Sequence, residues 1–264
     1  MKRKAGLIVN PIAGMGGKVG LKGTDGAEIL KKAILIGATP ESPRRTLRAL
    51  ERLAGLEDAL HFFSYPGKMG ESELAPSGFD HTVIGSITPG DTTAEDTERA
   101  AREIRAAGAE LLLFVGGDGT ARNIYNAVGD RVPVLGIPAG VKMHSAVFGT
   151  TPRNAGELAK LFLQGKAVGT REAEVMDIDE DAFRDQRVSA RLYGYLQIPF
   201  ERRLGQSVKA GAAGQEDTVV RAIALDVISN MEPDWTYIVG PGTTTGRSCG
   251  FLICRTPCWA WMWS

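Results

Sequence analysis

Short apolar segments alternate with longer amphipathic segments along the first two thirds of the chain. The apolar segments are predicted strands, at residues 5–9, 59–63, 81–85, 111–115 and 132–137. The amphipathic segments have helical spacing and cover residues 24–34, 42–56, 94–107 and 153–163. Ser42 is the predicted N-cap of the second helix, whose apolar positions are Leu47, Leu50, Leu53 and Leu56, and Asp91, Thr92 and Thr93 are the N-cap candidates of the third. Residues 138–145 are turn residues that we expect to open a further helix. Strands that alternate with helices predict a parallel sheet with helices on both faces. The fold class predicted from this pattern is therefore α/β.

The apolar run at residues 111–115 leads directly into Gly116-Gly117-Asp118-Gly119-Thr120, and residues 121–128 then have helical character. A helix that begins at such a turn presents unpaired backbone N–H groups at one point, which suits a phosphate group. The glycines allow the backbone to approach a ligand closely. We therefore predict that Asp118 lies beside a bound phosphorylated nucleotide. The alternative is that Asp118 only caps the following helix.

Three further glycine-containing segments follow predicted strands, at residues 10–17, 136–145 and 240–246. Ligands in parallel sheets bind beyond the carboxyl ends of the strands, so these segments are candidate phosphate loops. An ordinary connection remains the alternative for residues 10–17, and a Walker loop is excluded because Gly-Lys-Ser/Thr is missing. Lys142 is a candidate phosphate contact, with solvated surface as its alternative. His144 is a candidate proton shuttle or phosphate contact, with a structural role as its alternative. Asp118 is the only carboxylate in the four segments.

The pattern changes near residue 170, where apolar and acidic residues alternate as in strands, and residues 188–196 also alternate. We predict a second, β-rich domain that begins there and includes an amphipathic helix at residues 219–228. Residues 247–264 differ from the rest, because they hold all three cysteines and three of the four tryptophans. Our hypothesis is a shift of reading frame near Arg247; the alternative is a native aromatic tail that docks on the core or on another subunit.

The chain has 31 basic and 31 acidic residues, so its net charge excludes the basic surface of a typical nucleic-acid-binding protein. It shows no signal peptide and no apolar run of membrane-spanning length. The cysteines fit neither a zinc site nor a disulfide framework, and no residue is assigned as a metal ligand. We expect a cytoplasmic protein whose partners are small-molecule nucleotides, without nucleic acid or membrane. A homo-oligomer is left open.

Taken together, these motifs resemble the NAD kinase and diacylglycerol kinase superfamily. The resemblance rests on Gly116–Thr120, on the loop that begins at Asn10 and on Gly136-Ile137-Pro138-Ala139-Gly140. With residues 142–145 and 240–245, the pattern is similar to the ATP-NAD kinase branch that includes acetoin-catabolism X-type proteins. The resemblance covers residues 5–246. It implies a Rossmann-like domain at residues 1–168 and a β-rich (α+β) domain at 169–246, with the site between them. We expect the second domain to be incomplete, because the atypical tail at 247–264 replaces the segment with which the family continues.

The resemblance also implies an activity: transfer of a phosphoryl group from ATP or polyphosphate to the 2′-hydroxyl of NAD, giving NADP. Asp118 would orient or deprotonate this hydroxyl, and Mg²⁺ would bridge the donor phosphates. The implied nucleotide-binding residues are Asn10, Gly14, Gly16, Gly17, Gly116, Gly117, Gly119, Thr120, Asn123, Gly140, Lys142, His144, Gly242, Thr243 and Thr244.

Two departures from the family pattern leave alternatives open. The β-rich half lacks a clear Asn-Glu pair, which typical NAD kinases use to bind their substrate. Arg122-Asn123 stands where lipid kinases carry Asn-Glu. The alternative functions are therefore a lipid or other small-alcohol kinase of the same superfamily, and a catalytically inactive nucleotide-binding protein.

Overall fold

The computed structural model describes residues 2–15, 34–88, 90, 92–140, 143–166, 169–178, 190–201, 203–204, 222–223, 225–232 and 237. The chain divides into two compact units, residues 1–208 and residues 209–264. The sheet, its helices and the candidate site all belong to the first unit. Several predictions lie outside the described residues: Gly16, Gly17, Lys142, Gly242, Thr243, Thr244, most of the helix at 24–34 and the tail at 247–264. The domain boundary at residues 168/169 stays a prediction.

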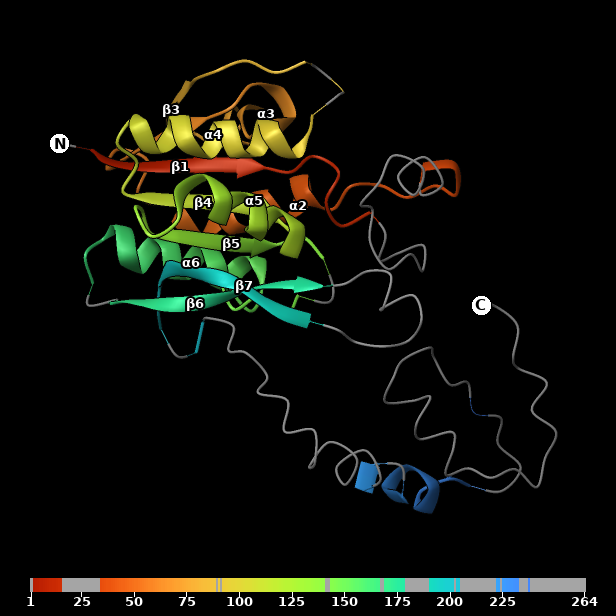
Figure 1. Cartoon of the computed structure of the whole chain (residues 1–264). Coiled ribbons are helices and arrows are strands. Elements are labelled where there is room, and N and C mark those ends of the chain that lie inside the picture. The colour runs from red at the N-terminus through yellow and green to blue at the C-terminus, as the bar shows by residue number, and fades with distance from the viewer. Residues whose placement is uncertain are drawn as a thin grey trace. The chain divides into compact units, whose positions relative to one another are not determined.

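A five-stranded parallel sheet forms the centre of the first unit, with strand order β3-β2-β1-β4-β5 (Figure 1). Its strands are β1 (Arg3–Val9), β2 (Leu60–Ser64), β3 (Asp80–Val83), β4 (Leu111–Gly116) and β5 (Val134–Pro138). The five predicted strands and the α/β class are confirmed. The chain order reverses between β1 and β4, and the carboxyl ends of two such strands are where open α/β sheets bind ligands.

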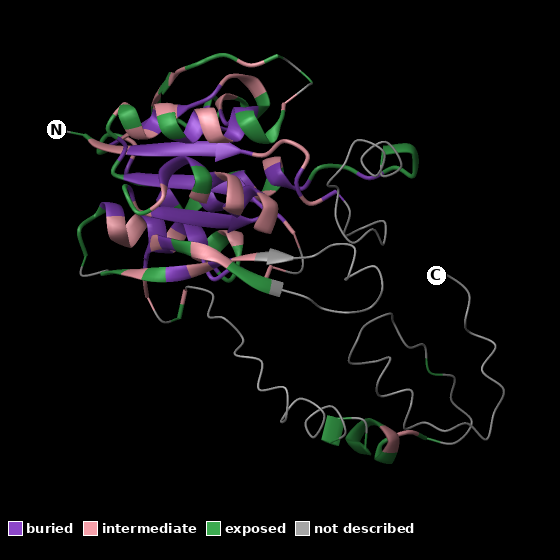
Figure 2. Ribbon diagram, viewed as in Figure 1, coloured by how far each residue is buried: buried purple, intermediate pink, exposed green. Residues whose placement is uncertain are grey.

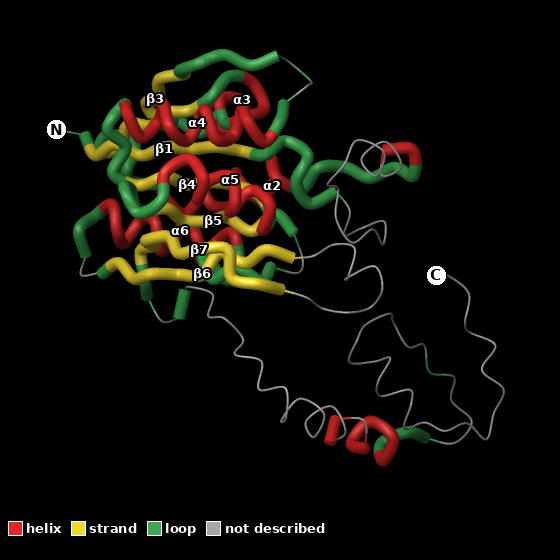
Figure 3. Tube along the Cα trace, in the orientation of Figure 1, coloured by secondary structure: helices red, strands yellow, loops and turns green. Residues whose placement is uncertain are grey.

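Helices cover both faces of this sheet (Figure 3). One apolar cluster joins the sheet to α2 (Ser42–Leu50) and α6 (Pro152–Leu163). The other joins it to α4 (Ala94–Ala106) and α5 (Asp118–Val128). The central strands are consequently buried on both sides, as Figure 2 shows, and every residue of β4 is buried. This explains why β4 is a continuous apolar run and does not alternate.

Shorter elements complete the described part. Between α2 and α4 lie two 3₁₀ turns, η2 (Glu51–Leu53) and η3 (Gly67–Met69), and the single-turn helix α3 (Glu71–Leu74). The predicted alternating segments form β6 (Thr170–Ile178) and β7 (Ala190–Pro199), which pair antiparallel. Inward residues of this pair, Val175 and Leu196 among them, join the same apolar cluster as Ile124 of α5. The small sheet therefore packs on the α5 side of the first unit.

The helix boundaries test three sequence predictions. Thr93 caps α4 as predicted, because its hydroxyl accepts the N–H of Asp96, whose carboxylate accepts the N–H of Thr93. The predicted cap at Ser42 is wrong, since α2 begins at Ser42 itself and its hydroxyl donates to the carbonyl of Ala13 (3.4 Å). Leu47, predicted on the apolar face of this helix, is 39% exposed. Burial on α2 falls instead on Ser42, Thr46, Ala49 and Leu50.

A third prediction, a helix opening at the end of residues 136–145, is also wrong. After β5, Phe148 forms an isolated bridge with Gly136 of that strand, and the next helix in the described residues begins at Pro152. The N–H groups of His144 and Ser145, which would start such a helix, are bonded to the side chain of Asp118. A side-chain acceptor from another element thus replaces the first turn of the expected helix.

The contact between α2 and α6 gives a testable expectation. A Cβ atom at Gly156 would lie 2.2 Å from the carbonyl oxygen of Ala49 and 2.9 Å from Cβ of Arg52, so the helices would have to separate. Alanine is the better helix former by about 1 kcal/mol, but overpacking costs about 1–3 kcal/mol and occasionally more. The difference between these two effects is about 1 kcal/mol, so we expect Gly156→Ala to lower the free energy of unfolding by about that amount, measured by urea titration.

The matched control for this substitution is Gly169→Ala. A Cβ atom at Gly169 meets no other atom within 4 Å, so this substitution should leave the urea midpoint nearly unchanged. A Gly156→Ala variant as stable as the wild type would show that the two helices do not approach as closely as described.

Candidate functional site

The loop after β1 and the start of α5 meet at the carboxyl edge of the sheet. The backbone N–H of Asn10 donates to the carbonyl of Val115 (3.0 Å), and its Nδ2 donates to Oγ1 of Thr120 (3.0 Å). Its Oδ1 accepts the N–H of Ile12 (3.2 Å), which closes a tight turn. Asn10 therefore links the first glycine loop to the first turn of α5, where Thr120 is buried.

Asp118 lies in the first turn of α5, after the N-cap residue Gly117. Its Oδ2 accepts the N–H of His144 (3.0 Å), and its Oδ1 accepts the N–H of Ser145 (2.9 Å). Its carboxylate therefore bonds to another loop and does not cap its own helix. The side chain remains 14% exposed, and the helix dipole favours its negative charge.

The hydrogen bonds also determine the ionisation of this carboxylate. Burial is the largest single influence and raises the pKa of Asp118, but the hydrogen bonds from His144 and Ser145 together outweigh it. The net pKa lies below the usual range, so the group is ionised at neutral pH. Such a carboxylate is a weak base and a good hydrogen-bond acceptor. It can orient a hydroxyl or attract a cation more readily than it can hold a proton.

The segment that holds Asp118 is itself anchored to β6. The hydroxyl of Ser145, which is fully buried, accepts the N–H of Met176 (2.9 Å). The N–H of Ala146 donates to the carbonyl of Glu174 (2.8 Å). Nδ1 of His144 lies 3.4 Å from Oδ2 of Asp118 and has no hydrogen-bond partner in the described residues. His144 thus contacts the carboxylate through both its backbone and its ring.

The two glycines before Asp118 have different roles. A Cβ atom at Gly116 would lie 2.3 Å from Oγ1 of Thr120, so this glycine is required by the packing of the turn. A Cβ atom at Gly117 would meet nothing within 4 Å, and the backbone there is extended, with φ −117°. No described neighbour requires a glycine at this position. Open space beside the N-terminus of α5 is what a close approach of phosphate needs.

The glycine loop at residues 10–15 and the loop after β5 also contact each other. Gly14 has φ +82°, and a Cβ atom there would lie 2.4 Å from the carbonyl oxygen of Ala139. At the other side of that loop, a Cβ atom at Gly140 would lie 3.2 Å from Sδ of Met143. The first of these glycines is therefore needed for the two loops to approach each other.

The structure brings together part of the predicted set. Asn10, Thr120, Asp118 and His144 are linked by the contacts above. Gly119 lies in the first turn of α5 and Asn123 one turn further along the same helix. Residues that sequence reasoning missed are Ser145, Glu41 and Arg45. Ser145 lies within a predicted loop. Glu41 is the N-cap residue of α2 and Arg45 lies in its first turn, and no local sequence motif marks either of them.

The described residues include no group of three His, Cys, Asp or Glu side chains that could hold a metal ion. Mg²⁺ bound with substrate phosphates needs only one or two carboxylates. Asp118 fits this requirement, because it is ionised and each of its oxygens keeps a lone pair after accepting one N–H group.

In the described part of the chain, no helix is long and apolar enough to cross a membrane.

A parallel sheet, a glycine turn at its switch point and an ionised aspartate at a helix N-terminus define an α/β protein with a candidate ligand site at the carboxyl edge of its sheet. Residues 5–167 match the family of the ATP-NAD kinase N-terminal domain, and the chain belongs to this family. A search of curated proteins finds no match.

Among solved structures, the chain is similar to a protein from Bacillus anthracis str. Sterne assigned as a diacylglycerol kinase. The identity is 19%, the TM-score 0.34, and the match covers 67% of this chain and 46% of that one. A second structure, of a diacylglycerol kinase from the same organism, has 20% identity, a TM-score of 0.36 and the same coverages. The chain thus spans less than half the length of these structures, and at such TM-scores they carry no argument about function.

Proposed function

We propose that the protein is an NAD kinase: it transfers a phosphoryl group from ATP or polyphosphate to the 2′-hydroxyl of NAD and forms NADP. The observation that carries the proposal is the family match over residues 5–167, which contains the whole Asp118 turn and both neighbouring loops. Two features of the site support the proposal. The open space at Gly117 leaves room for a phosphate group, and the ionised Asp118 can accept a hydrogen bond from the attacking hydroxyl.

In this mechanism the first N–H groups of α5 and the glycine turn bind phosphate oxygens, and Asp118 orients the acceptor hydroxyl. A strong base is not required, because phosphoryl transfer passes through a loose transition state that depends on positioning and charge neutralisation. Mg²⁺, when bound with the donor, would be held by Asp118 and would neutralise phosphate charge. His144 keeps the carboxylate in place through its backbone N–H group.

The test is an assay of the full-length chain with Mg²⁺, NAD and either ATP or polyphosphate, in which NADP is measured by enzymatic cycling. Formation of NADP supports the proposal, and the two donor arms identify the phosphate source. A parallel arm supplies ATP and diacylglycerol in vesicles. Phosphatidic acid without NADP would identify a lipid kinase, and nucleotide binding without any product would identify a binding protein. Either result rejects the proposal.

A substitution at Gly117 separates ligand binding from stability. The methyl group of Gly117→Ala meets no protein atom within 4 Å, so the only expected loss of stability is the poorer N-cap, about 1 kcal/mol. The same methyl group occupies the space we assign to phosphate, and we expect the affinity for ATP to fall about tenfold. Isothermal titration with ATP and thermal unfolding measure the two effects. Unchanged affinity would place the phosphates away from this turn.

A further inference from the structure

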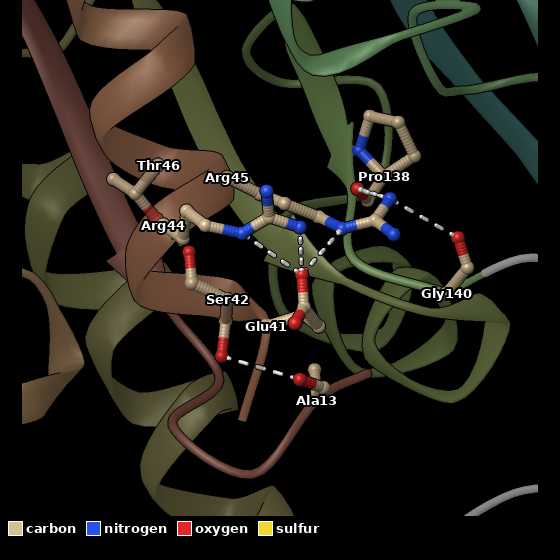
Figure 4. Close-up of polar contacts among 8 residues, drawn as sticks. All are labelled: Ala13, Glu41, Ser42, Arg44, Arg45, Thr46, Pro138 and Gly140. Atoms are coloured by element: carbon tan, nitrogen blue, oxygen red, sulfur yellow. Dashed lines mark hydrogen bonds and ion pairs between the residues drawn. The ribbon is translucent and has the colours of Figure 1, made fainter. Parts of the chain in front are cut away.

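An ion pair at the start of α2 lies against the loops after β1 and β5 (Figure 4). Arg45 donates from Nη1 to the carbonyl oxygens of Pro138 (3.0 Å) and Gly140 (3.3 Å). Its Nε lies 3.9 Å from Oε2 of Glu41, which also accepts from Arg44. The Arg45 side chain is 20% exposed and that of Glu41 is 7% exposed. The pair is therefore largely removed from water at the edge of the sheet.

The same region holds the loop after β1. The N–H of Glu41 donates to the carbonyl of Ala13 (3.3 Å), and the hydroxyl of Ser42 donates to the same oxygen (3.4 Å). A Cβ atom at Gly14 would lie 2.9 Å from Cβ of Glu41, in addition to its conflict with Ala139. The start of α2 thus fixes the first glycine loop and the loop after β5 at the same time.

The loop after β5 is coupled to the turn that carries Asp118. Pro138 pairs with Gly116 in the sheet, and the N–H of Ala139 donates to the carbonyl of Gly116 (3.0 Å). Gly116 is two residues before Asp118. Arg45 therefore acts on residues bonded directly to the central turn, without touching that turn itself.

Electrostatics give the guanidinium a second effect. Carbonyl oxygens at a phosphate-binding edge repel an anion, and Arg45 draws two of them into charge-assisted hydrogen bonds. Burial lowers the pKa of Arg45, while Glu41 opposes this, and a guanidinium in a protein keeps its charge. The positive charge of Arg45 consequently offsets the negative ends of the Pro138 and Gly140 carbonyl groups at this edge of the sheet.

We infer that Glu41 and Arg45 are positioning residues, which hold the loop at residues 10–15 and the loop at residues 138–140 in one arrangement for binding phosphate. The kinetic consequence rests on the proposed kinase function. The structural consequence does not, because it concerns the loops of the free protein. The two can therefore be tested separately.

The first experiment measures amide hydrogen exchange by NMR in the free protein. The reporters are the N–H groups of Ala139, His144 and Ser145, which are bonded to Gly116 and Asp118. In Arg45→Gln we expect these amides to exchange about tenfold faster, because local opening loses its charged anchor. Arg45→Lys should restore slow exchange in part, since the ammonium keeps the charge. Arg48→Gln, an exposed arginine on the same helix, is the matched control and should exchange like the wild type.

The second experiment uses the assay with ATP and NAD. Arg45→Gln should raise the KM for ATP about tenfold, with partial recovery in Arg45→Lys and no change in Arg48→Gln. A merely structural role would lower the folded fraction, and with it the apparent kcat, but would leave the KM unchanged. Glu41→Gln keeps the size of the side chain and removes its charge, and it should loosen the same amides if Arg45→Gln does not fold.

The outcomes are distinct. Faster exchange at the reporter amides in Arg45→Gln supports the inference, as does faster exchange in Glu41→Gln if only that variant folds. This holds even when the wild type has no kinase activity, because that result rejects the proposed function alone. Wild-type exchange rates at these amides in folded variants would overturn the inference, whatever the activity. An active wild type whose KM for ATP does not respond to Arg45→Gln would also overturn it.

Discussion

Replacement of Asp118 by asparagine is expected to lower kcat for NADP formation by about 10²–10⁴-fold, the usual contribution of a positioned catalytic carboxylate. The neutral amide has one oxygen where the carboxylate has two, and it carries no charge to hold the acceptor hydroxyl or a cation. The KM for ATP should rise much less than kcat falls, because the glycine turn binds the donor phosphates and Asp118 would hold only the accompanying Mg²⁺. Steady-state kinetics over a range of ATP and NAD concentrations measure both constants.

The asparagine amide also meets an N–H group of His144 or Ser145 with its own NH₂ group, since both oxygens of Asp118 accept backbone N–H groups. This conflict should cost about 1–3 kcal/mol of stability, so thermal unfolding must confirm that the variant is folded at the assay temperature. Asp130→Asn, an exposed aspartate in the turn after the same helix, is the control and should keep wild-type kcat. Folded Asp118→Asn with wild-type turnover would remove Asp118 from the mechanism.

The second large effect is on stability and concerns Glu73 in α3. Its side chain is 95% removed from solvent, Oε2 has no hydrogen-bond partner in the described residues, and burial raises its pKa to about 7. The folded protein therefore binds this proton more tightly than the unfolded chain does, for which the pKa is about 4.5. The stabilisation is complete below pH 4.5 and is lost as the pH rises through 7.

The size of this effect follows from the shift: each pKa unit corresponds to about 1.4 kcal/mol, so the carboxyl group costs about 3 kcal/mol above neutral pH. Glu73→Gln removes the ionisation. Relative to the wild type, the variant should gain about 2.5 kcal/mol of stability between pH 5 and pH 8.5, measured by urea titration at both pH values. Glu51→Gln, at an exposed position, should show no such gain. Parallel pH dependence of wild type and Glu73→Gln would mean that Glu73 does not ionise in a buried site.

The sheet could be predicted from the sequence because its signal is local. The central strands β1, β4 and β5 are largely apolar runs, and the strand segments alternate with helical spacing, so the order of elements requires few assumptions. The edge strand β3 is the exception, because its residues Asp80–Val83 are only partly buried. The cap at Thr93 was equally local, since Thr93 and Asp96 are three residues apart. The failures at Ser42 and Ser145 have one cause: in both cases a partner distant in sequence, Ala13 or Asp118, takes the group that local rules assign to a helix start.

In the candidate site, too, only the features with a local sequence signal could be predicted. The position of Asp118 at the carboxyl edge follows from the strand that precedes it. The groups that fix its carboxylate do not, because they are backbone N–H groups, and every residue except proline has one. Arg45 was missed for a related reason: its acceptors are backbone carbonyls 93 and 95 residues away in sequence, and no side-chain pattern marks such oxygens.

The anchoring of Ser145 and Ala146 to β6 has a consequence for where the functional unit ends. The family match stops at residue 167, which includes all five parallel strands and the Asp118 turn. Met176 and Glu174, which bond the segment that holds Asp118, both lie beyond that limit. A fragment cut at residue 167 would keep every signature residue between 5 and 167. It would lose the hydrogen bonds from β6 that hold the segment bonded to Asp118. The smallest fragment able to hold this carboxylate rigidly extends at least through β6.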